Sequence, residues 1–190
     1  MLIRNKEEGF TLVELLVVIA IIGLLTTLSV AAVKTAKAKA NIAKALHDAD
    51  VISQAIQTLG NDTFQWPGHQ RVGEVATTTN NEICGTDLSG DDCGARTLEA
   101  GTSGLIANDS GVPFSGWTGP YLPSLPIDAW GRQYFFDTDY SVDINNEPCG
   151  CEGGGCSDAV VVGSYGPDGE GVPDGAGAYG CDDIIKILLK

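Results

Sequence analysis

Basic residues are scarce in this sequence, and acidic residues are abundant. Lysine and arginine together number 11, against 25 aspartates and glutamates, so the formal net charge at pH 7 is -14. A surface of this charge repels phosphate backbones, and we therefore expect no direct nucleic-acid partner. The same surface attracts hard cations such as calcium, which bind through oxygen atoms.

Motifs of catalysis are also lacking. The sequence has two histidines, and neither stands in a Ser-His-Asp arrangement. It contains no Gly-rich phosphate loop and no haem-attachment motif. Because neither histidine has a partner in motif spacing, general-base chemistry is unsupported. We therefore expect that this chain is not an enzyme.

Long apolar runs are confined to the start of the chain. From Phe10 to Val33 there are 24 residues with one charge, that of Glu14. A helix of this length spans about 36 Å, which is enough to cross the apolar core of a bilayer. A secretory signal peptide would have a shorter apolar region that ends at a small-residue cleavage site. We expect a leader at residues 1–9 and the membrane-spanning half of a helix at residues 10–33.

The single charge in this segment needs an explanation. A carboxylate inside a membrane helix costs about 2.5–3.5 kcal/mol on insertion scales, so it usually has a partner. One interpretation is that Glu14, near the helix start, reaches the lipid headgroups. The other is that Glu14 is held for pairing with a cation from another chain. The position of the residue leaves both open.

The residues around Glu14 resemble the class III signal of type IV pilins and pseudopilins. The match consists of a charged leader, the pair Gly9-Phe10, a glutamate four positions after Phe10, and the long apolar run. The resemblance implies that a prepilin peptidase cuts between Gly9 and Phe10 on the cytoplasmic side. It implies that the new amino group of Phe10 is then N-methylated. It also implies that Glu14 forms an assembly salt bridge with the amino group of a neighbouring subunit.

Helical periodicity continues beyond the apolar run. Over residues 34–60 apolar residues step by three or four positions, which predicts one face of an amphipathic half helix: Ile42, Leu46, Ala49, Ile52, Ile56 and Leu59. Gly60-Asn61-Asp62 is a stop signal at its end. The two halves together predict one helix from about Phe10 to Leu59.

The remaining residues, 61–190, are expected to form a globular head. Thr, Asn, Gly, Asp and Ser dominate residues 72–116, which indicates long loops. Short runs of residues typical of β-strands, separated by turn residues, predict four strands: 133–137, 140–144, 159–164 and 184–189. The expected fold class is α+β and pilin-like, with a long amino-terminal helix packed on a small antiparallel sheet.

Two stretches of the head resemble major pseudopilins of type II secretion. Residues 116–122 read Gly-Trp-Thr-Gly-Pro-Tyr-Leu, and residues 126–134 read Pro-Ile-Asp-Ala-Trp-Gly-Arg-Gln-Tyr. We expect Trp117, Trp130 and Tyr134 to be core or helix-facing aromatic residues without a ligand.

A third stretch resembles the calcium loop of the same subfamily. It begins with Gly-Pro-Asp-Gly at residues 166–169 and ends with Asp182, Asp183 and Ile184. The resemblance implies a calcium ion within residues 164–184, with Asp168 and Asp182 as side-chain ligands. Further candidate ligands are Asp183, Asp174 and Glu170. The alternative is an acidic, solvated loop.

The six cysteines all lie in the Gly-rich later part of the chain: Cys84, Cys93, Cys149, Cys151, Cys156 and Cys181. An even number behind a membrane-targeting segment favours disulfides formed in an oxidising compartment. Zinc ligation and free thiols are alternatives, although no Cys-x-x-Cys pair is present. The connectivity is not readable from sequence, and Cys84 with Cys93 is the favoured local closure.

Taken together, the resemblance implies a structural subunit of an extracytoplasmic helical filament. The first hypothesis is a type II secretion-like pseudopilus involved in protein secretion. The alternatives are a type IV pilus subunit for adhesion, twitching motility or DNA uptake, and a membrane-anchored calcium-binding module.

The same resemblance implies partners and a location. The expected partners are further copies of the chain, the prepilin peptidase, the inner-membrane assembly platform, minor pilins or pseudopilins, and the membrane. Before assembly the chain would cross the inner membrane once, with its leader in the cytoplasm and its head outside. After assembly it would belong to a periplasmic or cell-surface filament.

Overall fold

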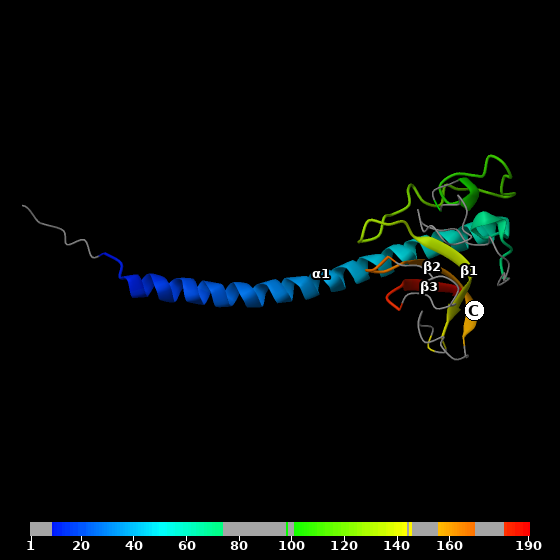
Figure 1. Ribbon diagram of the computed structural model, residues 1–190. Helices are drawn as coiled ribbons and strands as arrows, with labels where there is room; N and C mark the ends of the chain where they lie inside the picture. The colour runs from blue at the N-terminus through cyan, green and yellow to red at the C-terminus, as the bar shows by residue number, and fades with distance from the viewer. Residues whose placement is uncertain (1–8, 74–97, 99–100, 144, 146–155, 170–180) are drawn as a thin grey trace, which may run out of the picture. The chain divides into compact units, whose positions relative to one another are not determined.

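A computed structural model describes residues 9–73, 98, 101–143, 145, 156–169 and 181–190 (Figure 1). Within them the chain forms a long helix, two short 3-10 helices and three strands. In chain order these are α1 (Leu12–Thr63), η1 (Pro67–His69), η2 (Gly101–Ser103), β1 (Phe135–Val142), β2 (Ser157–Ser164) and β3 (Ile184–Leu189). The expected α+β class, a long helix followed by a small antiparallel sheet, is confirmed.

The chain divides into two compact units, Met1–Ala40 and Asn41–Lys190, and α1 contributes residues to both. In the first unit, the large apolar side chains described between Phe10 and Val33 are exposed, from 48% at Val17 to 86% at Phe10. By length and composition α1 is able to cross a membrane. An uninterrupted helix with apolar residues on every side is what a bilayer requires, because all of its backbone polar groups are bonded within the segment.

In the second unit, one side of α1 is buried in the head. Ala45, Ala49, Ile52, Ile56 and Leu59 are fully or almost fully inaccessible to solvent. Their three- and four-residue steps place them on one face of the helix. The predicted face is therefore confirmed from Ala49 to Leu59.

The same prediction is wrong at the beginning of this face. Ile42 and Leu46 are 40% and 50% exposed, and Ala45 is buried in their place. Both apolar residues lie on one flank of the buried stripe, about 60–100° around the helix from Ala45. Periodicity alone does not distinguish the centre of a stripe from its flank.

The end of α1 lies slightly beyond the predicted stop signal. The helix continues to Thr63, and Phe64 then adopts a left-handed conformation with φ of 58°. Gly60 serves a different purpose from the one expected. A Cβ atom there would lie 3.1 Å from the side chains of both Trp66 and Val72, so the glycine allows close packing and does not end the helix.

The three strands form one antiparallel sheet in the order β1-β2-β3. The strands predicted at 133–137 and 140–144 are in fact one strand, β1. Its pairing with β2 is irregular between Asp137 and Tyr140. There the Asp137 carboxylate accepts a 2.8 Å hydrogen bond from the backbone N–H of Asp139. This local turn interrupts the alternation of side chains, which explains why the sequence reads as two runs.

Apolar side chains are buried on both faces of the sheet. Phe136, Val160 and Val162 pack in one cluster with the buried face of α1, including Ile52 and Ile56. A second cluster contains the alternate residues of β2 together with residues of β1, whose alternation shifts at the irregularity after Asp137: Phe135, Tyr140, Val142, Ala159, Val161 and Tyr165. Because side chains alternate across a strand, the two clusters occupy the two faces.

Polar contacts add specific links between α1 and the rest of the head. The Asp48 carboxylate accepts hydrogen bonds from Lys44, at 2.7 Å, and from the buried Tyr134 hydroxyl, at 3.0 Å. Burial, and secondarily the Asp48 charge, raise the pKa of the Tyr134 phenol. Lys186 of β3 forms a 2.7 Å ion pair with Asp50, and this contact lowers the pKa of the Asp50 carboxyl.

A third link holds the carboxyl end of α1. The Asp62 carboxylate accepts hydrogen bonds from the hydroxyls of Thr118 and Tyr121, at 2.5 and 2.9 Å. The Thr118 bond, followed by the Tyr121 bond, lowers the pKa of Asp62 below its ordinary value of 3.8. The segment that resembles the Gly-Trp-x-Gly-Pro-Tyr-Leu motif therefore fixes the end of the helix.

We expect the Asp62 contacts to produce a distinct pH dependence of stability. A lowered folded-state pKa means that the ionised carboxylate stabilises the head above pH 3.8, and that this stabilisation is lost as the pH falls through the folded-state value. Asp62→Asn should lower the melting temperature by a few degrees near neutral pH, and the difference from wild type should shrink towards about pH 3. Thermal unfolding of the full chain in detergent, followed by circular dichroism, would measure the decrease in melting temperature at neutral pH and at acid pH.

Asp158→Asn is the matched control, because Asp158 is exposed and accepts a long, 3.5 Å hydrogen bond from Ser141. It should melt like wild type near neutral pH. The charge-dependent role of Asp62 would be contradicted if the melting temperatures of Asp62→Asn and wild type differed by the same amount at neutral and at acid pH.

Candidate functional site

The predicted cleavage position lies in exposed chain immediately before α1. Gly9 and Phe10 precede the helix, which begins at Leu12, and both are exposed. A Cβ atom on Gly9 would have no neighbour within 4 Å. A non-helical, exposed peptide bond is accessible to a protease, whereas a bond inside the helix is not. The leader charges at residues 4 and 6 lie outside the described residues.

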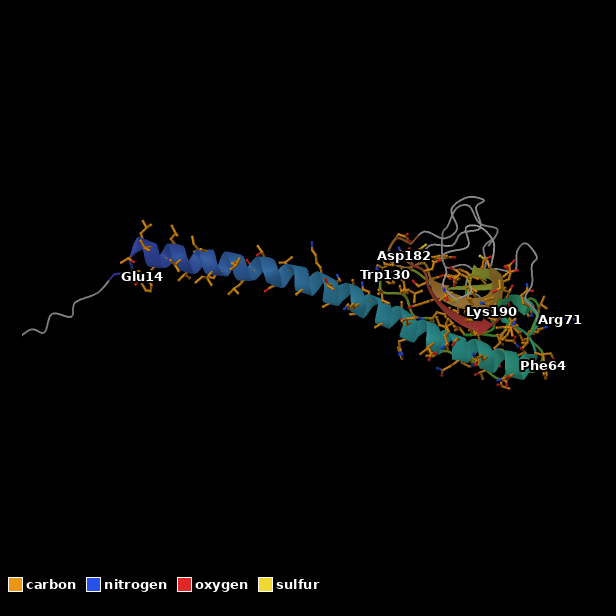
Figure 2. All side chains as sticks on the ribbon, turned by 90° about the horizontal axis from the view of Figure 1, so that it is seen from below. Glu14, Phe64, Arg71, Trp130, Asp182 and Lys190 are labelled. Atoms are coloured by element: carbon orange, nitrogen blue, oxygen red, sulfur yellow. The ribbon has the colours of Figure 1, made fainter. Side chains whose placement is uncertain are left out.

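Glu14 forms hydrogen bonds to its own chain that the sequence analysis missed. Its carboxylate accepts bonds from the backbone N–H of Thr11, at 2.9 Å, and from the Thr11 hydroxyl, at 2.7 Å. The Thr11 hydroxyl oxygen in turn accepts a 3.3 Å bond from the Glu14 backbone N–H. These bonds form a capping box at the start of α1, where Figure 2 shows Glu14.

The Thr-x-x-Glu spacing is visible in the sequence, so the capping box was readable there. It means that a single subunit already stabilises the Glu14 carboxylate with two donors from Thr11. Assembly through Glu14 would therefore exchange one set of hydrogen-bond partners for another. The intermolecular pairing stays a prediction.

Asp128, in the Pro-x-Asp-x-Trp-Gly segment, organises the turn that follows it. One carboxylate oxygen accepts hydrogen bonds from the backbone N–H groups of Trp130 and Arg132, at 2.9 and 2.7 Å. The other accepts a 2.6 Å bond from the Ser164 hydroxyl at the end of β2. The side chain is buried, and these bonds satisfy it.

The aromatic residues of these segments behave largely as predicted. Tyr134 is buried and faces α1 through its bond to Asp48, while Trp117 and Trp130 are half-buried. The indole N–H of Trp117 donates a 2.7 Å bond to the Gly104 carbonyl. The sequence analysis did not single out Asp128, because nothing local distinguishes a buried aspartate from an exposed one.

The Gly-Pro-Asp-Gly turn follows β2 and is closely packed. Gly166 has a φ of 60°, and a Cβ atom there would collide with the Asp182 backbone. Gly169 has a φ of 74°, and a Cβ atom there would collide with the Arg132 guanidinium. Both glycines are required by positive φ and by close approach.

This turn brings the two predicted calcium ligands together. The Asp182 carboxylate accepts a 3.1 Å hydrogen bond from the backbone N–H of Asp168. Asp183 is buried, and its carboxylate accepts a 2.7 Å bond from the Tyr140 hydroxyl, so it is part of the sheet contacts. Asp174 and Glu170 lie outside the described residues.

The donor chemistry of this turn fits calcium, but the ligand set is incomplete. Calcium takes six to eight oxygen ligands, whereas the contact shown here joins the Asp182 carboxylate to the backbone N–H of Asp168. Among the residues that the structure describes, no group of three or more His, Cys, Asp or Glu residues is placed to share a metal. The calcium site therefore stays a prediction.

The described cysteines are not alike. Cys156 is disulfide-bonded, whereas Cys181 has a free thiol exposed at the turn before β3. This free thiol contradicts the predicted disulfide of Cys181. The other four, Cys84, Cys93, Cys149 and Cys151, lie outside the described residues, so the Cys84–Cys93 closure stays a prediction.

Comparisons with known proteins agree with the amino-terminal site. Residues 4–30 match the family model described as the prokaryotic N-terminal methylation motif. The type II secretion system core protein G of Escherichia coli K12 is 30% identical over 133 residues, which cover 68% of this chain and 71% of that protein. The protein of the same name from Pseudomonas aeruginosa is 27% identical over 69% of this chain and 73% of its own length.

A pilus protein is similar over a comparable length. The type IV major pilin protein of Neisseria gonorrhoeae is 26% identical over 130 residues, 68% of this chain and 66% of its own. These relatives are named as secretion and pilus proteins and not as enzymes. Together with the methylation motif and the long helix followed by a small antiparallel sheet, they show that this chain belongs to the family of type IV pilins and type II secretion pseudopilins.

Proposed function

We propose that this chain is a structural subunit of a type II secretion-like pseudopilus, an extracytoplasmic helical filament involved in protein secretion. The observation that carries the proposal is the exposed, apolar first unit of the chain, preceded by the exposed Gly9–Phe10 bond. Its side chains need an apolar environment, which the membrane provides before assembly. Helices of other copies provide the same environment afterwards, so assembly does not require that this surface enter water.

The charges at the start of α1 would set the register between subunits. Cleavage after Gly9 creates a positive amino group on Phe10, four residues before Glu14. In an apolar filament core each of these charges is costly alone and is stabilised when paired. A pair formed between two chains thus favours one axial position of each subunit against its neighbour.

Sequence segments in the head favour the secretion system over a surface pilus. The stretches at 116–134 and 166–184 resemble those of major pseudopilins, and two of the relatives above carry the name core protein G. The alternative, a type IV pilus subunit, is supported by the pilin relative from Neisseria gonorrhoeae. Under either function the partners are the prepilin peptidase, an inner-membrane assembly platform, minor subunits and further copies of this chain.

We also propose that the 164–184 loop binds calcium through Asp168 and Asp182. Two carboxylates on adjacent backbone segments supply the hard oxygen ligands that calcium prefers. The ion would stabilise the loop against the mutual repulsion of its acidic residues. If amino-terminal processing did not occur, the alternative function would be a calcium-binding module on an ordinary membrane anchor.

Processing is tested by the intact mass and amino-terminal sequence of the protein purified from its native membranes. We expect a chain that begins at Phe10 with a methylated amino group, because the Gly9–Phe10 bond is exposed and non-helical. Gly9→Val, which places a branched side chain next to the cleaved bond, should leave the leader attached. A chain that begins at Met1, in cells that process other prepilins, would overturn the proposed filament function.

Replacing Glu14 tests the assembly pair. Glu14→Leu should leave a stable membrane protein that assembles poorly, with filament yield lower by about tenfold or more, because the amino group of the neighbour is left buried and unpaired. Filament yield is measured as the amount of subunit in sheared filament fractions, relative to the total membrane-bound subunit. Ser29→Leu is the matched control, since the Ser29 hydroxyl bonds the carbonyl of Leu25 within its own helix. Equal filament yields from the two variants would refute the pairing role.

Calcium binding is tested by thermal unfolding of the full chain in detergent, with EDTA and with added calcium. At a calcium concentration 100 times the dissociation constant, binding stabilises the folded state by about 2.7 kcal/mol, which raises the melting temperature by several degrees. Asp168→Asn and Asp182→Asn should each remove most of this increase, while Asp158→Asn should retain it. A wild-type melting temperature that is the same in EDTA and in calcium would eliminate the site.

A further inference from the structure

Arg132 is held at a fixed position beside the Gly-Pro-Asp-Gly turn. Its backbone N–H donates a 2.7 Å hydrogen bond to the Asp128 carboxylate, and its carbonyl accepts a 2.8 Å bond from the Asp128 N–H. Asp128 is itself buried and bonded to Ser164 at the end of β2. The backbone of Arg132 is therefore linked through Asp128 to the end of β2.

The guanidinium of Arg132 reaches across to the turn, 34 residues later in the sequence. Its Nη2 group donates a hydrogen bond to the carbonyl oxygen of Gly166. The other terminal nitrogen of the guanidinium, Nη1, lies so close to Gly169 that a Cβ atom there would collide with it. The Arg132 Nε atom lies 3.8 Å from the Asp128 carboxylate. A positive charge thus lies against both glycines that flank Pro167 and Asp168.

The proposed calcium ligands belong to this same turn. Asp168 lies between the two glycines that Arg132 contacts, and its N–H is bonded to the Asp182 carboxylate. Figure 2 shows Trp130, two residues before Arg132, at the same end of the head as Asp182. Phe64 and Arg71 lie at the opposite end.

A fixed guanidinium at this position has two physical consequences. It offsets part of the negative charge of the turn, so the turn is stabilised without a metal ion. It also repels an incoming divalent cation and occupies the Gly166 carbonyl, an oxygen of the kind that calcium uses as a ligand.

We propose that Arg132 is an internal cation of this turn, which holds the turn in place without metal and weakens calcium binding at Asp168 and Asp182. The second half of the proposal rests on the proposed calcium site, and the first half does not. The chain would then bind calcium more weakly than the same loop without an arginine at this position. Its dependence on calcium would be set by a residue outside the loop.

The test compares Arg132→Gln with wild type, as full chains in detergent, by melting temperature in EDTA and by calorimetric titration with calcium chloride. We expect the variant to melt several degrees lower in EDTA, because the turn loses its charged donor. We expect its dissociation constant for calcium to be about tenfold lower at low ionic strength. At saturating calcium the two melting temperatures should converge.

Two further variants separate the effect of the Arg132 charge from that of its hydrogen bonds. Arg132→Lys keeps the charge but loses the planar fork of donors, so it should melt lower in EDTA while its calcium affinity stays within about twofold of wild type. Arg71→Gln removes an arginine at the other end of the head and should leave the calcium affinity unchanged. If Arg132→Gln does not fold, Arg132→Met, which keeps the apolar stem of the side chain and removes its charge, carries the same two measurements.

The outcomes distinguish this proposal from the calcium site itself. Equal melting temperatures in EDTA and equal calcium affinities for wild type and Arg132→Gln would overturn the role of Arg132. If neither protein binds calcium, the calcium site is eliminated together with the second half of the proposal. A lower melting temperature of Arg132→Gln in EDTA would then still support the first half.

Discussion

The apolar side chains between Phe10 and Val33 have to be kept out of water, and the rest of the structure depends on this constraint. They are exposed along the first part of α1, on all sides of the helix. Since burial of apolar surface contributes about 25 cal/mol per Å², a helix of this kind is stable in a bilayer or among similar helices and aggregates elsewhere. This segment therefore needs an apolar environment, which a membrane or a bundle of similar helices provides.

Within the head, α1 serves as one wall of the core. Alanines and aliphatic residues of one face, such as Ala49 and Ile56, pack on the sheet, and the carboxylates at Asp48, Asp50 and Asp62 tie the neighbouring flanks to the motif segments and to β3. The apolar contacts supply most of the free energy, because exposed ion pairs contribute little. The hydrogen bonds to Asp48 and Asp62 instead determine where the helix lies against the sheet, since each has a fixed geometry.

The two charged sites of the chain use the same physical device, an internal partner that stabilises a charge before any external partner binds. Thr11 donates two hydrogen bonds to Glu14, and Arg132 donates one to the Gly166 carbonyl beside Asp168. In each case the internal bond lowers the free energy of the unbound state. The proposed binding of a second subunit, and of calcium, would then depend on the difference between the internal and the external partner, and not on the external contact alone.

The sequence by itself determined the family and the long apolar helix, and it predicted the residues of the amino-terminal site. These depend on contiguous signals, namely an uninterrupted apolar run and the fixed spacing of Gly9, Phe10 and Glu14. Only the tertiary structure decided which flank of α1 is buried, that β1 is a single strand, that Cys181 is free and that Arg132 contacts the acidic turn. The reason is that these features depend on contacts between residues far apart in the chain, which form only when the helix, sheet and turns pack together, so no local pattern encodes them.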